Sequence, residues 1–321
     1  MENFIFSINA TLPIFLIMLS GLFFRKIGLM KEDFTAALNK FVFKVALPVL
    51  LFQDLSVQDF ASSWDGKFVL FCFLVTLLSI LLITLISFLF IHDTGKRGEF
   101  IQVSYRSSAA ILGIAFIQNI YGDGNSGMAP LMILGSVPLY NIFAVIVLTV
   151  TAPSADGRQR RPDRALAMKT LRGIITNPII IGILAGLLWS VLGIPQPKIF
   201  AATIKNIAVL ATPLGLMAMG SAFDLTKAKA EVAPALAASI IKLMLLVAAF
   251  LPLAVLLGFR NQELVALLVM LGSASTVSCY IMARNMGHEG TLTSSTVMMT
   301  TFGCAFSLTF WLYLLKTLAL I

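Results

Sequence analysis

The chain has 321 residues, of which 59% are hydrophobic and only 12% are charged. Soluble domains carry about 25% charged residues, so this composition excludes a soluble globular protein and indicates an integral membrane protein. The net charge of +8 does not indicate nucleic-acid binding, because the basic residues lie in short loops between apolar segments, where they usually set membrane topology.

Ten segments are apolar enough to cross a bilayer as helices, which takes about 20 residues each. In chain order they are 5–25, 35–55, 68–92, 99–121, 128–152, 173–194, 200–222, 231–258, 262–286 and 292–317. The longest loop, 153–172, is polar, basic and interrupted by proline, and we interpret it as a cytoplasmic linker. The sequence therefore predicts an all-α membrane protein with five helices in 1–152 and five in 173–321.

The two halves match when one is shifted by 165 residues. At this offset Gly and Pro residues coincide: Pro13 with Pro178, Gly21 with Gly186, Gly28 with Gly193, Pro48 with Pro213 and Gly122 with Gly287. Such residues are too scarce for composition alone to explain the matches. With five spans in each half, the second half enters the membrane from the opposite side. We therefore predict two inverted five-helix repeats, a common plan of secondary transporters.

The loops after the odd-numbered segments carry most of the basic residues, among them Arg25, Lys96 and Arg284. Positively charged loops stay in the cytoplasm. We therefore expect a multi-pass protein of the plasma (cytoplasmic) membrane with both termini on the outer side.

Arg106 is the most informative ionisable residue, because it lies near the middle of the fourth segment, where a charge is costly and usually functional. Its guanidinium and the neighbouring Ser107 and Ser108 could hold a carboxylate at two points. Alternatively, Arg106 extends to the headgroups or pairs with Glu99. The Asp and Glu residues, Asp54 among them, lie at span ends or in loops. Buried charge is therefore net positive, which favours an anionic substrate.

The ninth segment carries small and hydroxyl-bearing residues at mid-membrane. The candidates for substrate binding are Ser273, Ser275, Thr276, Ser278 and Tyr280. This run aligns with 107–113 in the fourth segment. Small residues let helices approach, and hydroxyls satisfy backbone groups where a helix opens. We predict a binding site where the two segments cross; tight helix packing alone is the alternative.

Five further residues are weaker candidates. Gly113 lies where the fourth segment could open, Asn119 lies at its polar end, Tyr140 and Asn141 lie in the fifth segment, and Lys242 lies near the middle of the eighth. The sequence contains no P-loop, HExxH motif or nucleophile elbow, so we do not expect an enzyme or a bound cofactor.

Three short stretches resemble the auxin efflux carrier family of membrane transporters. They are 46–52 (ALPVLLF), 105–108 (YRSS) leading to 113–115 (GIA), and 280–284 (YIMAR). The resemblance covers nearly the whole chain. This family is similar in fold to the bile acid sodium symporters. That implies a panel of helices 1, 2, 6 and 7 beside a core of helices 3–5 and 8–10, with helices 4 and 9 broken where they cross.

Members of this family carry organic anions such as auxin, malonate or malate. Relatives often have Asn at the place of Ser108, and Pro at the places of Ala115 and Ser275. Here all three positions carry other residues.

Together these features predict a secondary transporter that moves a small organic anion by alternating access, with coupling to H⁺, coupling to Na⁺ and uniport all left open. An anion channel and a membrane-embedded metabolite sensor are the alternatives. The expected partners are the small organic anion, the lipid bilayer and, as an open alternative, a second copy in a homodimer. Nucleic acid is not expected.

Overall fold

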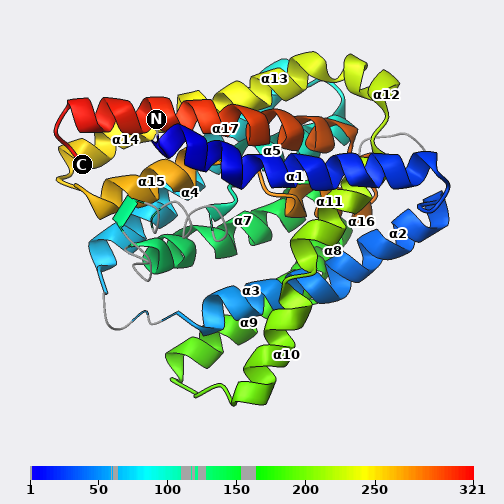
Figure 1. The fold of residues 1–321 in the computed structure, drawn as a ribbon, viewed down its shortest axis with the longest axis horizontal. Coiled ribbons are helices and arrows are strands. Elements are labelled where there is room, and N and C mark those ends of the chain that lie inside the picture. The colour runs from blue at the N-terminus through cyan, green and yellow to red at the C-terminus, as the bar shows by residue number, and fades with distance from the viewer. Residues whose placement is uncertain are drawn as a thin grey trace.

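A computed structural model describes residues 2–58, 60, 64–109, 117, 120, 121, 128–152 and 164–321, and these form helices and connecting loops without any strand (Figure 1). The all-helical prediction is confirmed for these residues. In chain order the elements are α1 (Glu2–Lys26), α2 (Glu32–Phe41), η1 (Val42–Ala46), α3 (Leu47–Ser56), α4 (Gly66–Phe90), α5 (Thr94–Tyr105), α7 (Ala129–Thr151), α8 (Arg164–Ile175), α9 (Pro178–Val191), α10 (Lys198–Ala208), α11 (Ala211–Ala222), α12 (Leu225–Ala230), α13 (Val232–Ile240), η3 (Ile241–Leu245), α14 (Leu246–Leu256), α15 (Gln262–Gly272), α16 (Ser278–Asn285) and α17 (Thr291–Thr317).

Two long helices contain a π-helical turn. η1 joins α2 and α3 into one span of 25 residues, Glu32–Ser56, and η3 joins α13 and α14 into another, Val232–Leu256. A π turn inserts an extra residue and frees backbone groups from the regular hydrogen-bond ladder, and such turns often mark functional sites.

Six helices in the described part of the chain are long and apolar enough to cross a membrane, or up to seven if the bent pair Leu166–Ile175 and Pro178–Val191 counts as one. These seven correspond to seven of the ten expected segments. The other three are 5–25, 99–121 and 262–286. The first forms the 25-residue helix α1. The other two contain helix ends at Tyr105 and Gly272, so neither is one continuous helix.

The helices pack in two sets of neighbours. In one set α1 contacts α11, and α3 contacts α9 and α10; Figure 1 shows α3, α9 and α10 together at the bottom of the view. In the other set α4, α5 and α7 contact one another, α13 packs against α17, and α14 packs against α15. α1 also lies beside α17, which connects the two sets.

Two close helix contacts are equivalent under the 165-residue offset. A Cβ atom added at Gly21 would lie 2.2 Å from the carbonyl oxygen of Met217, so α1 and α11 touch through backbone. A Cβ atom at Gly186 would lie 2.8 Å from the carbonyl oxygen of Phe52, on α9 and α3. Gly21 and Gly186 differ by 165 residues, and so do Phe52 and Met217. Equivalent positions in the two halves of the chain therefore make the same close contact.

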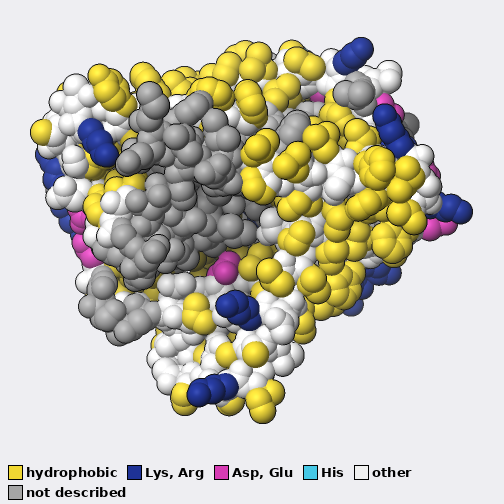
Figure 2. Space-filling model, viewed as in Figure 1, with side chains coloured by type: hydrophobic (Ala, Val, Ile, Leu, Met, Phe, Trp, Pro, Cys, Tyr) yellow, Lys and Arg dark blue, Asp and Glu magenta, His cyan; other side chains and the backbone are white. Residues whose placement is uncertain are grey.

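The surface suits a lipid environment. Large apolar side chains on α4, such as Leu70, Leu78 and Leu85, are about half exposed or more. Figure 2 shows apolar side chains over a broad area of one face, with the Lys and Arg side chains mostly toward its edges. In a soluble protein such a surface would be an aggregation hazard.

Acidic residues at helix ends act as caps. Asp65 accepts a hydrogen bond from the Phe68 N–H at the start of α4, and Asp93 accepts one from the Gly95 N–H at the start of α5. Asp224 begins α12, where N–H groups of Thr226 and Lys227 donate to its carboxylate and lower its pKa. The N-terminal end of a helix favours negative charge, so capping is enough to explain these acids.

Candidate functional site

The candidate site is built where two helices end inside the molecule. α5 ends at Tyr105, and the backbone continues through Arg106 in an extended conformation. α15 ends at Gly272, and α16 begins only at Ser278, so 273–277 is not helical. The N–H of Ser108 donates a 2.9 Å hydrogen bond to the carbonyl oxygen of Ala274. The two non-helical segments therefore meet through their own backbones.

Hydroxyl groups stabilise the interruption of the ninth segment, which contains no proline. The hydroxyl of Ser275 donates to the carbonyl oxygen of Val103 at 2.7 Å, and the N–H of Ser275 donates to the hydroxyl of Thr300 at 3.1 Å. The side-chain amide of Gln102 donates to the carbonyl oxygen of Cys279 at 3.0 Å. The two bonds of Ser275 satisfy backbone groups that a continuous helix would pair internally.

Arg106 is buried at this crossing with neutral partners. Its guanidinium donates to the Oδ1 atom of Asn141 and to the hydroxyl of Ser278, both at 2.9 Å, and it contacts the sulfur of Met282. The side chain is 2% exposed, and its Nε–H has no hydrogen-bond partner among the described residues. Within the same part of the chain Arg106 forms no salt bridge. The Glu99 carboxylate, which was the alternative partner, instead accepts hydrogen bonds from Gly290 and Thr293.

A cavity of about 90 Å³ lies at the crossing. A single water needs at least about 10–15 Å³ of such volume, so the cavity has room for several waters or a small anion. Its polar lining consists of Asp54, Arg106, Ser107, Ser108, Tyr140, Asn141, Thr212, Ser275, Thr276, Ser278 and Thr301. Its apolar lining includes Leu47, Leu50 and Leu51 from α3 and Val277 and Ile281 near α16. α3 therefore contributes three leucines and one carboxyl group, whereas most of the hydrogen-bond donors come from the other elements.

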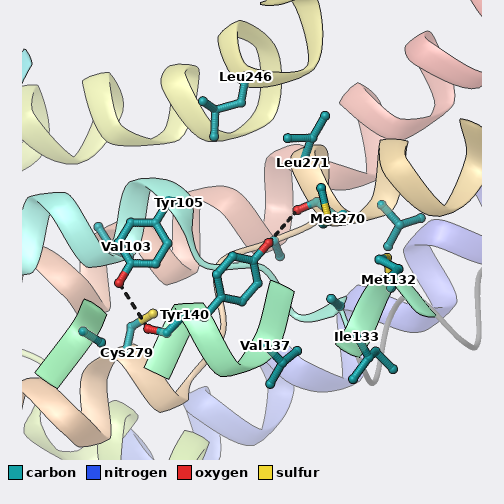
Figure 3. Close-up of a cluster of buried hydrophobic side chains, with 14 of the residues drawn as sticks. Val103, Tyr105, Met132, Ile133, Val137, Tyr140, Leu246, Met270, Leu271 and Cys279 are labelled. Atoms are coloured by element: carbon teal, nitrogen blue, oxygen red, sulfur yellow. Dashed lines mark hydrogen bonds between the residues drawn. The ribbon is translucent and has the colours of Figure 1, made fainter. Parts of the chain in front are cut away.

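Tyr140 connects the cavity to the end of α15. Figure 3 shows its ring between Tyr105 and Met270, with the hydroxyl donating to the carbonyl oxygen of Met270 at 3.3 Å. The hydroxyl of Tyr105 donates to the backbone carbonyl of Tyr140 at 3.2 Å, and the two ring centroids are 5.8 Å apart. The tyrosines thereby tie α5, α7 and α15 together behind the cavity.

Comparison with known proteins places this architecture in one family. The model of the family described as membrane transport protein matches residues 6–312. The chain belongs to this family, the auxin efflux carriers. It is also 29% identical over 144 residues, or 42% of its length, to auxin efflux carrier component 8 of Arabidopsis thaliana. The match covers 39% of that relative's length.

Most of the residues predicted for the site of this transporter line the cavity. They are Arg106, Ser107, Ser108, Tyr140, Asn141, Ser275, Thr276 and Ser278. Ser273, Tyr280 and Lys242 do not line it. Gly113 and Asn119 lie outside the described residues.

The three predicted residues beyond the cavity have separate surroundings. Ser273 is fully buried at the end of α15. Tyr280 lines a second cavity of about 560 Å³, together with Arg25, Lys227 and Arg284. Lys242 is fully buried and donates hydrogen bonds to the carbonyl oxygens of Met270 and Leu271 and to the hydroxyl of Ser107. Ser107, which lines the cavity, therefore lies between the cavity and the ammonium group of Lys242.

Asp54 lines the cavity, although the sequence alone predicts it at a span end. Its Oδ2 atom is buried without a hydrogen-bond partner in the described part of the chain. A signal is present in the sequence, since Leu47, Leu50, Leu51 and Asp54 follow the spacing of one helix face. Asp54 therefore adds an acidic group to the same lining as Arg106.

Proposed function

We propose that this family member is a secondary transporter that carries a small organic anion across the membrane by alternating access. The observation that supports this most is Arg106, a buried guanidinium in the wall of a cavity, with neutral hydrogen-bond partners and an Nε–H that has none among the described residues. A buried charge is costly unless it is paired. No carboxylate of the described residues forms a salt bridge with Arg106, and a carboxylate entering the cavity would supply that partner.

The chemistry of the lining favours a carboxylate over a cation or a neutral solute. An arginine can hold a carboxylate through two parallel N–H bonds, which fixes its orientation as well as its charge. Hydroxyls of Ser107, Ser108 and Ser278 lie in the same lining and can hydrogen-bond further oxygens. The apolar wall from Leu47 to Leu51 would receive the carbon skeleton.

For the architecture we propose ten spans in two inverted repeats. The paired contacts Gly21–Met217 and Gly186–Phe52 support this, because a two-fold relation between the halves produces each such contact twice. Figure 1 shows the start of α1 and the C-terminus at the same end of the molecule, which an even number of crossings requires. We propose that this end faces outward in the plasma membrane, and that helices 1, 2, 6 and 7 form the panel.

Alternating access is supported by the two separate cavities. The helix α16 contributes Ile281 to the smaller cavity at the crossing, and Tyr280 and Arg284 to the larger one. The larger cavity also includes Arg25 and Lys227, which belong to the basic segments expected to face the cytoplasm. A carrier needs a central site that closes from one side at a time, whereas a channel needs one continuous wet path.

A binding screen tests the proposal and identifies the class of substrate at the same time. Purified protein would be heated with a panel of mono- and dicarboxylates and with neutral and cationic solutes of similar size, because a ligand that binds the folded state raises its melting temperature. We expect stabilisation by at least one carboxylate, lost in Arg106→Ala and retained in Arg97→Ala. Arg97 lies on α5, the helix that ends just before Arg106, and it contacts the carbonyl oxygen of Ile91 and the ring of Phe88. Stabilisation by cations or neutral solutes alone would refute the proposal.

A further inference from the structure

We propose that the ammonium group of Lys242 is a built-in cation that occupies the place of a coupling sodium ion at the end of α15. Transport by this protein would then not require sodium. The inference rests on the proposed transport function, because it concerns the ion that would drive transport through the same cavity.

The ammonium group is held entirely by oxygen atoms. Lys242 is 0% exposed, and its Nζ atom donates to the carbonyl oxygen of Leu271 at 2.5 Å, to that of Met270 at 3.3 Å and to the hydroxyl of Ser107. An ammonium has three N–H donors, so all three are used. Within the described part of the chain, no carboxylate forms a salt bridge with Lys242.

The two carbonyl oxygens lie at the C-terminal end of a helix, which attracts positive charge. α15 ends at Gly272, so the carbonyl groups of Met270 and Leu271 lie in its last turn, without the N–H partners that a continuing helix would provide. The C-terminal end of a helix also carries partial negative charge. In transporters with interrupted helices, such carbonyls and helix ends coordinate the coupling cation. Here they coordinate a side chain that cannot leave.

The neighbouring backbone fixes Lys242 at this position. It lies in the π turn Ile241–Leu245, and the indole N–H of Trp311 donates to the carbonyl oxygen of Leu243 at 3.1 Å. A Cβ atom at Gly272 would lie 2.7 Å from a methyl carbon of Val247. The glycine therefore lets the end of α15 come close enough to α14 for the lysine to reach it.

Ser107 connects this cation to the proposed substrate cavity. Its hydroxyl accepts a hydrogen bond from Lys242, donates one to the carbonyl oxygen of Met270, and lines the cavity. The lysine charge therefore lies behind the cavity wall and adds to the positive potential of Arg106. A bound sodium ion would provide the same charge, but only while it remained bound.

A thermal-stability titration tests the inference. The wild type, Lys242→Ala and Lys67→Ala would be purified and melted in NaCl and in choline chloride at equal ionic strength. Lys67 is the matched control, because its ammonium also donates to a carbonyl oxygen just beyond a helix end, that of Leu257 at 2.6 Å, but in an exposed place. We expect equal melting temperatures in both salts for the wild type and for Lys67→Ala.

For Lys242→Ala we expect a lower melting temperature in choline chloride that rises progressively with Na⁺, because the vacated oxygens would bind the ion. A folded Lys242→Ala that does not respond to Na⁺ would overturn the inference. Sodium-specific stabilisation of the wild type would also overturn the inference, and this measurement does not depend on whether the variant folds. Failure of every carboxylate to bind would instead refute the proposed function. The sodium titration would still test whether Lys242 occupies a cation site.

Discussion

Arg106 donates a 2.9 Å hydrogen bond to the side-chain oxygen of Asn141, which joins the end of α5 to the middle of α7. The amide of Asn141 in turn donates to the carbonyl oxygen of Val137 at 2.9 Å, which fixes the orientation of the amide. The guanidinium is thus positioned before any substrate arrives. A positioned donor loses little conformational entropy on binding.

Arg106→Ala and Arg106→Lys should both weaken binding of the carboxylate found in the screen. Hydrogen bonds to charged groups contribute about 1.5–3 kcal/mol, and about 1.4 kcal/mol corresponds to a tenfold change. We therefore expect an increase in Kd of roughly ten- to a hundredfold for Arg106→Ala. The increase should be smaller for Arg106→Lys, which keeps the charge but not the two-point geometry. Calorimetric titration measures this, and an unchanged Kd in Arg106→Ala would remove Arg106 from the site.

Asp54→Asn should tighten anion binding. The carboxyl group of Asp54 lies in the same cavity lining as Arg106, and the substitution removes a negative charge while keeping shape and hydrogen-bonding capacity. The gain in affinity should be larger for dicarboxylates than for monocarboxylates, because the former carry more charge. Calorimetric titration with one acid of each type measures the difference. Loss of binding in Asp54→Asn would show that Asp54 contacts the substrate directly.

The glycines at the two equivalent helix contacts should be intolerant of larger residues. Gly21→Ala should destabilise the protein more than Gly186→Ala, because the added carbon would lie 2.2 Å from a backbone oxygen at the first position and 2.8 Å at the second. Overpacking typically costs about 1–3 kcal/mol. Gly173→Ala is the control, since its added carbon would meet no atom closer than 3.7 Å. Melting temperatures test the order, and equal values for all three variants would contradict the close contacts.

Membrane topology can be tested with single cysteines at exposed lysines. Lys227→Cys should react with an impermeant maleimide only from the cytoplasmic side, and Lys198→Cys only from outside. Both lysines are exposed, whereas the native Cys72, Cys279 and Cys304 are buried and should not interfere. The opposite labelling pattern would reverse the proposed orientation. Labelling of both from one side would show that the segment Lys198–Ala222 does not cross the membrane, which would contradict the proposed ten spans.

Much of this arrangement follows from local sequence signals. The apolar segments predict an all-helical membrane protein, and Arg106 can be singled out because charge is rare inside a span. The sequence could also have placed Asp54 in the site, because its spacing from Leu47 puts the two residues on the same helix face. The interruption of the ninth segment is harder to predict, because the segment has no proline and Ser275 instead stabilises the break through a hydrogen bond to Val103.

The surroundings of Lys242 cannot be predicted in this way. Its three oxygen partners come from Ser107, Met270 and Leu271, and they meet only through a π turn and the end of another helix. No pattern within the eighth segment encodes these contacts. A lysine among apolar residues therefore suggests substrate binding, while the structure places it behind the cavity.

We propose above all that Arg106 binds an organic anion that the protein then carries across the membrane. The most direct measurement is uptake of the radiolabelled carboxylate into proteoliposomes containing the wild type, Arg106→Ala or Arg97→Ala at equal protein content. We expect saturable uptake by the wild type and Arg97→Ala and none above empty liposomes by Arg106→Ala. Wild-type uptake by Arg106→Ala would contradict the proposal.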